Sequence, residues 1–213
     1  MNIIGNALTE LYRVFNIVNK DLFESKLPEP VITIQKGRKK SLGHFTLDKI
    51  WVSKDSEENE LDDNVSKYEI NINPLYFKER SAVEIIETLL HEMCHYMNKI
   101  LDIKDCNGNN HNKKFKEMAE SVGLICEKCN GVGYGFTRLS SDLEKYIKNE
   151  IMPDESVFTY FRTEIAKERK PREKKTFKYH CPNCGLEIKA KKGVKVVCTD
   201  CKKPFEMEVV DEV

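Results

Sequence analysis

The sequence predicts an α+β domain followed by a small cysteine-rich module, and three observations support that prediction. Residues 1–139 combine amphipathic helical stripes with short runs of β-branched residues. Residues 140–176 begin with helical patterns and become highly charged around a proline, which is typical of a linker. Residues 177–213 contain two Cys-x-x-Cys pairs. We therefore expect a folded domain, a helical and charged linker, and a separate module over these three ranges.

Composition excludes several classes of protein. The chain has 213 residues, 40% hydrophobic and 33% charged, which is enough apolar material for a core. Lys and Arg total 35, as do Asp and Glu, so the whole chain is neither a uniformly basic nucleic-acid binder nor an acidic tail protein. No apolar run approaches the ~20 residues of a membrane span, and the first residues lack a signal peptide. We expect a cytoplasmic protein with no membrane partner. Because that compartment is reducing, paired cysteines there indicate metal ligands before disulfides.

The first half of the domain is predicted from periodicity and from its prolines. Apolar residues recur at helical spacing over 3–24, and two prolines end that segment. A strand then follows over 31–35 and a hairpin pairs 42–45 with 49–52. Residues 68–72 alternate like another strand.

The strongest predicted helix runs from Ser81 to about Leu101. Glu84 stands three residues after Ser81, which is the spacing of a capping box. The predicted buried stripe consists of Val83, Ile86, Leu89, Leu90, Met93, Met97 and Ile100. Beyond it we expect a polar loop over 102–110, a helix over 112–122 stopped by Gly123, a hairpin of 124–126 with 133–137, and two helical segments around Pro153.

This helix carries an H-E-x-x-H motif, His91 to His95. Residues i and i+4 lie on one helical face about 6 Å apart, so both imidazoles can reach one ion. Glu92 is turned by about 100° from His91, which places its carboxylate beside the zinc-activated water rather than on the metal. Glu92 can then take that water's proton and later deliver a proton to the leaving amine. The alternative is a surface stripe without metal, but the other faces of this helix are apolar, which favours a buried site.

A catalytic zinc needs three protein ligands and one open position. A third histidine at position 101 would indicate a metzincin, but that residue is Leu101. Glu117 or Glu120 on the following helix are alternatives. We favour His111, because the loop around Gly108 lets the chain reverse and return it to the first helix. The alternative is that His111 binds no metal and is only the N-cap of the following helix.

These motifs resemble the SprT-like family of zinc metallopeptidases. The resemblance covers residues 3–137 and rests on Thr88–Asn98, His111–Phe115, Phe15, Asn19 and Phe23 with Leu27-Pro28, Gly43–Phe45 and Tyr68–Asn73. It implies that His91, His95 and His111 bind zinc and that Glu92 is the catalytic base. It also implies a minimal zincin fold, with a mixed sheet packed on the H-E-x-x-H helix. It is strongest for bacterial members, including those on phages and integrative elements, and a trailing zinc ribbon is usual.

The second module is predicted to be that zinc ribbon. Two Cys-x-x-Cys knuckles supply four thiolates to one tetrahedral structural zinc: Cys181, Cys184, Cys198 and Cys201. A redox pair is the alternative. Residues 186–190 and 194–197, turning at Gly193, fit a ribbon hairpin. A third pair, Cys126 and Cys129, has no partner pair in its own domain, and we interpret it as incidental.

Local charge points to DNA as a partner. Residues 161–192 contain 11 basic and 4 acidic side chains. A basic linker entering a ribbon suits contact with the phosphate backbone, and Phe177 and Tyr179 are candidates to stack on bases. A merely solvated linker, or a ribbon that binds protein, is the alternative.

Taken together, these features predict a zinc endopeptidase that cleaves DNA-associated or DNA-crosslinked proteins, a substrate class implied by the resemblance. Its two zinc ions are one catalytic and one structural. A substrate strand would add to a sheet edge near the cleft, for which Tyr68–Ile72 is a candidate. Gating of activity by DNA is a further hypothesis. The alternative function is a non-catalytic, zinc-containing DNA-binding or regulatory protein, although Glu92 has no use in a purely structural site.

Overall fold

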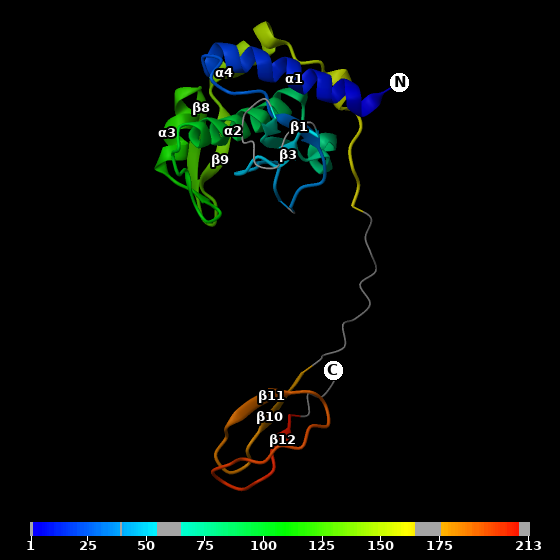
Figure 1. Cartoon of the computed structure of the whole chain (residues 1–213), viewed down its shortest axis with the longest axis vertical. Helices are drawn as coiled ribbons and strands as arrows, with labels where there is room; N and C mark the ends of the chain where they lie inside the picture. Colours follow the sequence, from blue (N-terminus) through cyan, green and yellow to red (C-terminus); the bar gives the residue numbers. More distant parts are fainter. Residues whose placement is uncertain (1, 39, 55–64, 165–175, 209–213) are drawn as a thin grey trace. The chain divides into compact units, whose positions relative to one another are not determined.

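The computed structural model describes residues 2–38, 40–54, 65–164 and 176–208. The chain forms two compact units, Met1–Glu164 and Ile165–Val213, which are described separately. In the first unit, helix α2 (Ala82–Ile100) runs through the centre, with β8 and β9 on one side of it and β1 and β3 on the other (Figure 1). This is the mixed α+β architecture that the sequence predicts.

The predicted N-terminal helix is α1, Ile3–Leu22. The Asn2 side chain accepts the Gly5 N–H and begins it. Its buried apolar stripe is Ala7, Leu11, Val14, Phe15 and Val18. In the last turn of α1, the Asn19 amide donates to Leu27 O at 2.8 Å and accepts from Leu27 N at 3.1 Å, which turns the chain toward the first strand.

The three-stranded sheet has the order β1-β5-β2, with β1 at Val31–Ile34, β5 at Glu69–Ile72 and β2 at Gly43–Phe45. β1 is parallel to β5 and β2 is antiparallel to it. β5 is therefore the central strand, so the prediction of Tyr68–Ile72 as a sheet edge is wrong. The edge that faces α2 is β2.

The predicted hairpin of 42–45 with 49–52 is also wrong. β2 pairs with β5, and β3 (Trp51–Val52) pairs with β4 (Ser66–Lys67). The reason is long-range packing: the Phe45 ring lies 5.0 Å from the Tyr96 ring on α2 and 5.4 Å from the Tyr68 ring. Burial of Phe45 against these rings outweighs the local turn.

α2 has the predicted capping box, in which Ser81 and Glu84 bond each other's backbone N–H groups. Beyond α2 lies a four-stranded sheet of order β6-β7-β9-β8. The remaining elements of this region are η1 (Pro74–Glu79), β6 (Cys106–Asn107), β7 (Asn110–His111), α3 (Lys113–Ser121), β8 (Leu124–Cys129) and β9 (Gly133–Leu139).

Residues 140–164 pack on the first unit instead of forming part of a linker. They form α4 (Ser141–Tyr146), η2 (Ile147–Ile151) and η3 (Glu155–Phe158). Four apolar side chains join the core: Leu143, Ile147, Ile151 and Phe158. Their burial is the physical reason for the difference, because a solvated linker has no apolar face to bury. The charged stretch 165–175 lies outside the described residues.

The second unit is a small antiparallel sheet of order β11-β10-β12. Its strands are β10 (Phe177–His180), β11 (Glu187–Ala190) and β12 (Glu206–Met207). β11 pairs with β10 and not with 194–197, so the predicted ribbon hairpin is wrong in its pairing. Buried Tyr179 explains this: its hydroxyl donates to Lys191 O at 2.9 Å and accepts from Gly193 N at 3.0 Å, which fastens the turn after β11 to β10.

Candidate metal centre

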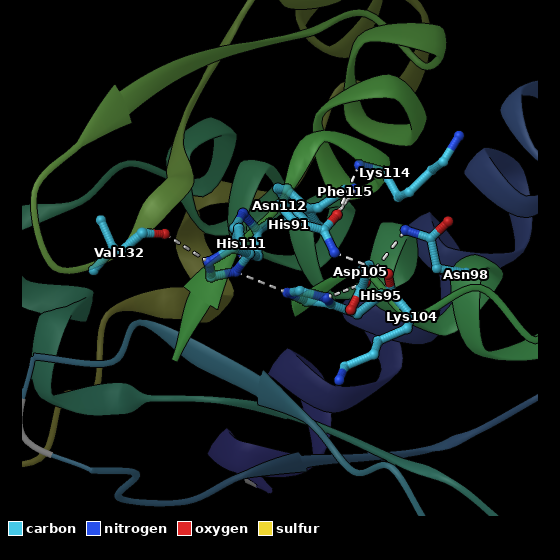
Figure 2. Close-up of polar contacts among 10 residues, drawn as sticks. All are labelled: His91, His95, Asn98, Lys104, Asp105, His111, Asn112, Lys114, Phe115 and Val132. Atoms are coloured by element: carbon cyan, nitrogen blue, oxygen red, sulfur yellow. Dashed lines mark hydrogen bonds and ion pairs between the residues drawn. The ribbon is translucent and has the colours of Figure 1, made fainter. Parts of the chain in front are cut away.

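Three histidines converge in the first unit. α2 places His91 and His95 one turn apart on one face, and β7 brings His111 to them. The Nε2 atom of His111 lies 3.2 Å from that of His91 and 3.0 Å from that of His95. Figure 2 shows the three rings turned toward one another. The structure thus brings together the three residues that the sequence analysis selected.

The ring orientations fit a shared divalent metal. The Nδ1 atoms of His91, His95 and His111 contact, in that order, Thr137 Oγ1 at 3.1 Å, Asp105 Oδ2 at 2.6 Å and Val132 O at 3.1 Å. A carboxylate and a carbonyl only accept, and the Thr137 hydroxyl is engaged with Glu87, so each Nδ1 carries the proton. All three Nε2 lone pairs therefore face one another. Tetrahedral zinc with Zn–N bonds of about 2.0–2.1 Å requires nitrogens about 3.3 Å apart, close to the observed spacing.

Burial favours the neutral form of His91 and His111. Desolvation lowers the pKa of His91 well below its ordinary value, and the neighbouring histidines lower it further. Desolvation also lowers the pKa of His111, again assisted by His95. Neutral imidazole is the form that binds a metal ion, so the burial of these two rings favours metal binding.

Glu92 lies beside this cluster. Its side chain is 5% exposed, and burial raises its pKa to about 7, while His95 and a hydrogen bond from the Phe45 backbone N–H oppose the rise. Gly43 lets β2 lie close to α2, because a Cβ at this position would lie 3.0 Å from Glu92 Oε1 and 2.9 Å from Thr88 Cγ2. The edge strand β2 thus lies directly against the carboxylate.

Two glycines of β9 pack directly against His111, and the sequence analysis did not identify them as functional. A Cβ at Gly133 would lie 2.2 Å from His111 O, and a Cβ at Gly135 would lie 2.3 Å from His111 Nδ1. Both distances are far below any real contact, so only glycine fits. The alternating glycines in Gly131–Gly135 are the sequence signal that could have been used.

A cleft of about 1310 Å³ opens over the histidines. β2 and the segment after it line one wall, and the turn between β8 and β9, together with β9, lines the other. Exposed apolar side chains stand on both rims, with Leu47 at 66% and Phe136 at 53% exposure. The cleft is large enough for an extended polypeptide segment.

The other candidate ligands of the first unit lie elsewhere. Glu117 and Glu120 form ion pairs with lysines of their own helix, and neither lines the cleft. Cys126 is buried and Cys129 is exposed, and within the described ranges they belong to no group of potential metal ligands. His44 is half exposed, with its Nε2 3.7 Å from Glu69 Oε1.

The second unit contains a four-cysteine cluster that can bind a metal such as zinc. The sulfurs of Cys181, Cys184, Cys198 and Cys201 all lie within 4.8 Å of one another. Cys184 Sγ and Cys198 Sγ are 3.8 Å apart, about the separation that Zn–S bonds of about 2.3 Å produce in a tetrahedron. Backbone N–H groups of Cys184 and Asn183 lower the pKa of Cys181 to about 7, which favours the thiolate.

Comparison with known proteins identifies a family. The family model of the SprT-like family matches residues 11–133, more than half of the chain, and this range includes all three histidines and Glu92. Neither the curated proteins nor the solved structures contain a match. Among the described residues, no helix is long and apolar enough to cross a bilayer.

Proposed function

This chain belongs to the SprT-like family, and from that membership we propose that its first unit is a zinc-dependent endopeptidase. His91, His95 and His111 would hold the catalytic zinc, and Glu92 would be the general base. The observation that carries the proposal is the convergence of three Nε2 lone pairs beside a buried carboxylate in an open cleft. Zinc bound there supplies Lewis acidity, which polarises a scissile carbonyl and lowers the pKa of water.

Glu92 handles the protons of the reaction. With its pKa raised to about 7, the carboxyl can take a proton from the attacking water and return one to the leaving amine at neutral pH. The Phe45 N–H holds the carboxylate toward the cleft. The same contact links the base to the strand along which we place the substrate.

β2 is the strand that an extended substrate would join. Beside β2, Leu42 O accepts from Asn73 N at 2.8 Å, and Thr46 N donates to Glu69 O at 3.0 Å, so the N–H and C=O groups of Gly43 and Phe45 face away from β5. The Phe45 N–H donates to Glu92 and Gly43 O accepts from the Ser41 hydroxyl, so the Gly43 N–H and Phe45 O are the groups that a substrate strand would bond. A polypeptide segment added along this edge would pass over Glu92 and the histidines. Backbone pairing of this kind favours unfolded or extended segments of a protein substrate.

DNA is the partner that we propose for the linker and ribbon. The 11 basic and 4 acidic side chains over 161–192 give this part of the chain a local positive charge, which attracts phosphates. The ribbon carries Lys178, Lys189, Lys191 and Lys192 on or beside β10 and β11. The enzyme would therefore act on proteins bound or crosslinked to DNA, and DNA would gate its activity.

Proteolysis of a DNA-binding protein tests this function, with wild type and Glu92→Gln each assayed with and without single-stranded DNA. The proposal predicts cleavage by wild type in the presence of DNA and none by Glu92→Gln. Cleavage that needs Glu92 but ignores DNA would retain the peptidase and reject the gating. Equal results for both proteins, with zinc bound, would favour a non-catalytic DNA-binding or regulatory protein.

A further inference from the structure

Asp105 occupies an unusual place between α2 and α3. Asp105 is 8% exposed. Its carboxylate accepts hydrogen bonds from His95 Nδ1 at 2.6 Å, from Asn98 Nδ2 at 3.2 Å and from the Cys106 thiol. Throughout the described part of the chain, no Lys or Arg lies within ion-pair distance of it.

A buried carboxylate without a Lys or Arg partner is electrostatically costly. The His95 ring joins this carboxylate to the place where the three Nε2 atoms meet. Of the three groups that hold the Nδ1 atoms, Asp105 alone carries a charge, because the other two are a hydroxyl and a carbonyl. A divalent cation at the histidines would balance it.

The backbone of Asp105 also holds the chain at His111. The N–H of Asn112, the next residue, donates to Asp105 O at 2.8 Å, and the Asn112 side-chain amide donates to Lys104 O at 2.9 Å. The same amide's oxygen accepts from Lys114 N at 2.7 Å and caps α3 (Figure 2). One short segment therefore fixes both the end of β7 and the start of α3.

Asn98 is committed to Asp105 as well. It lies one turn after His95 on α2 and is 1% exposed. Its NH₂ group donates to Asp105, and its Oδ1 has no hydrogen-bond partner among the described residues. Leaving a buried acceptor unpaired costs free energy. The Asn98 amide nevertheless takes the orientation in which its NH₂ group bonds Asp105 and its oxygen has no partner.

We propose that Asp105 is a positioning residue that couples two of the three histidines. Its carboxylate fixes the ring and tautomer of His95, and its carbonyl fixes the backbone beside His111. The inference rests on the proposed function, since a shared metal is what the two rings would hold. Loss of such an outer contact typically weakens metal affinity by about 10–100-fold.

The test compares Asp105→Asn with Asp102→Asn in the full chain. Asp102 lies in the same loop but is exposed, and its φ of 54° is one that Asn tolerates. Metal-free protein is titrated with Co²⁺ against a competing chelator. Cobalt on thiolates absorbs by sulfur-to-metal charge transfer and cobalt on imidazoles does not, so the ribbon and histidine sites are read separately. Thermal unfolding of the metal-free protein provides the structural control.

We expect Asp105→Asn to weaken Co²⁺ binding at the histidine site by about 10–100-fold. The ribbon site, the unfolding temperature of the metal-free protein and the Asp102→Asn variant should remain near wild type. Unchanged histidine-site affinity in Asp105→Asn would overturn the inference, as would an affinity loss matched by an equal loss of metal-free stability, which marks a merely structural contact. If wild type itself bound no Co²⁺ at the histidines, the proposed function would fall as well.

Discussion

Gly135→Ala is the most selective perturbation of the metal centre that the fold offers. The added methyl would lie 2.3 Å from Nδ1 and 2.6 Å from Cε1 of His111. Gly135 has no positive φ, so alanine meets no backbone strain there. The three atoms nearest to the added methyl all belong to the His111 ring, so the substitution acts first on that ring.

The magnitude follows from the distances. Ordinary contact requires about 3.4 Å or more, so the ring must move by about 1 Å. Metal–ligand bonds tolerate about 0.2 Å, and a displacement several times larger removes His111 from the ligand set. We expect at least about a 100-fold loss of metal affinity at the histidines, about 2.7 kcal/mol, and a matching loss of proteolysis.

Gly131→Ala is the matched control, since it lies on the same hairpin with no atom within 4 Å of the added Cβ. Its φ of 85° makes alanine strained, at a cost of about 1 kcal/mol of folding stability. Chelator competition should therefore show a loss of metal affinity in Gly135→Ala and none in Gly131→Ala. Thermal unfolding should show a loss of stability in Gly131→Ala. Full metal affinity in Gly135→Ala would refute the role assigned to this glycine.

Three further predictions concern other contacts. Thr137→Val removes the acceptor of His91 Nδ1, and chelator competition should show about a 10-fold loss of affinity at the histidine site. Glu10→Gln weakens the paired bonds to Arg13 that tie residues 151–154 to α1, and urea unfolding should show a loss of about 1–3 kcal/mol at pH 7. Because the hydrogen bond from Arg13 lowers the pKa of Glu10, wild type should lose this advantage as pH falls from the ordinary glutamate value of 4.5 through the lowered one, so the gap between the two proteins should close in acid. Cys198→Ser should unfold the second unit alone, seen as collapse of its NMR amide dispersion with the first unit's signals unchanged, because the buried apolar residues over 176–208 are Tyr179 and two cysteines.

Local patterns predicted the parts of the fold that local forces determine. The bounds of α1 and α2 follow from apolar periodicity and from the Ser81 capping box, and the meeting of His91 with His95 follows from helical geometry. The choice of His111 as third member depended on recognising a chain reversal at Gly108, and the structure places it there.

The features that sequence reasoning missed depend on contacts between distant segments. β2 pairs with β5 because Phe45 packs on Tyr96, a partner about fifty residues away. Residues 140–164 join the core because isolated apolar side chains such as Ile147 find a surface that only the folded unit provides. The importance of Asp105 follows from loop geometry, which no spacing rule encodes.

The central claim is that the three histidines hold a metal ion beside Glu92. Crystallographic anomalous scattering at the zinc absorption edge, on the full chain purified with zinc, tests it most directly. The account predicts one peak within about 2.0–2.1 Å of the Nε2 atoms of His91, His95 and His111, and a second among the four cysteine sulfurs. A peak at the cysteines with none at the histidines would contradict it.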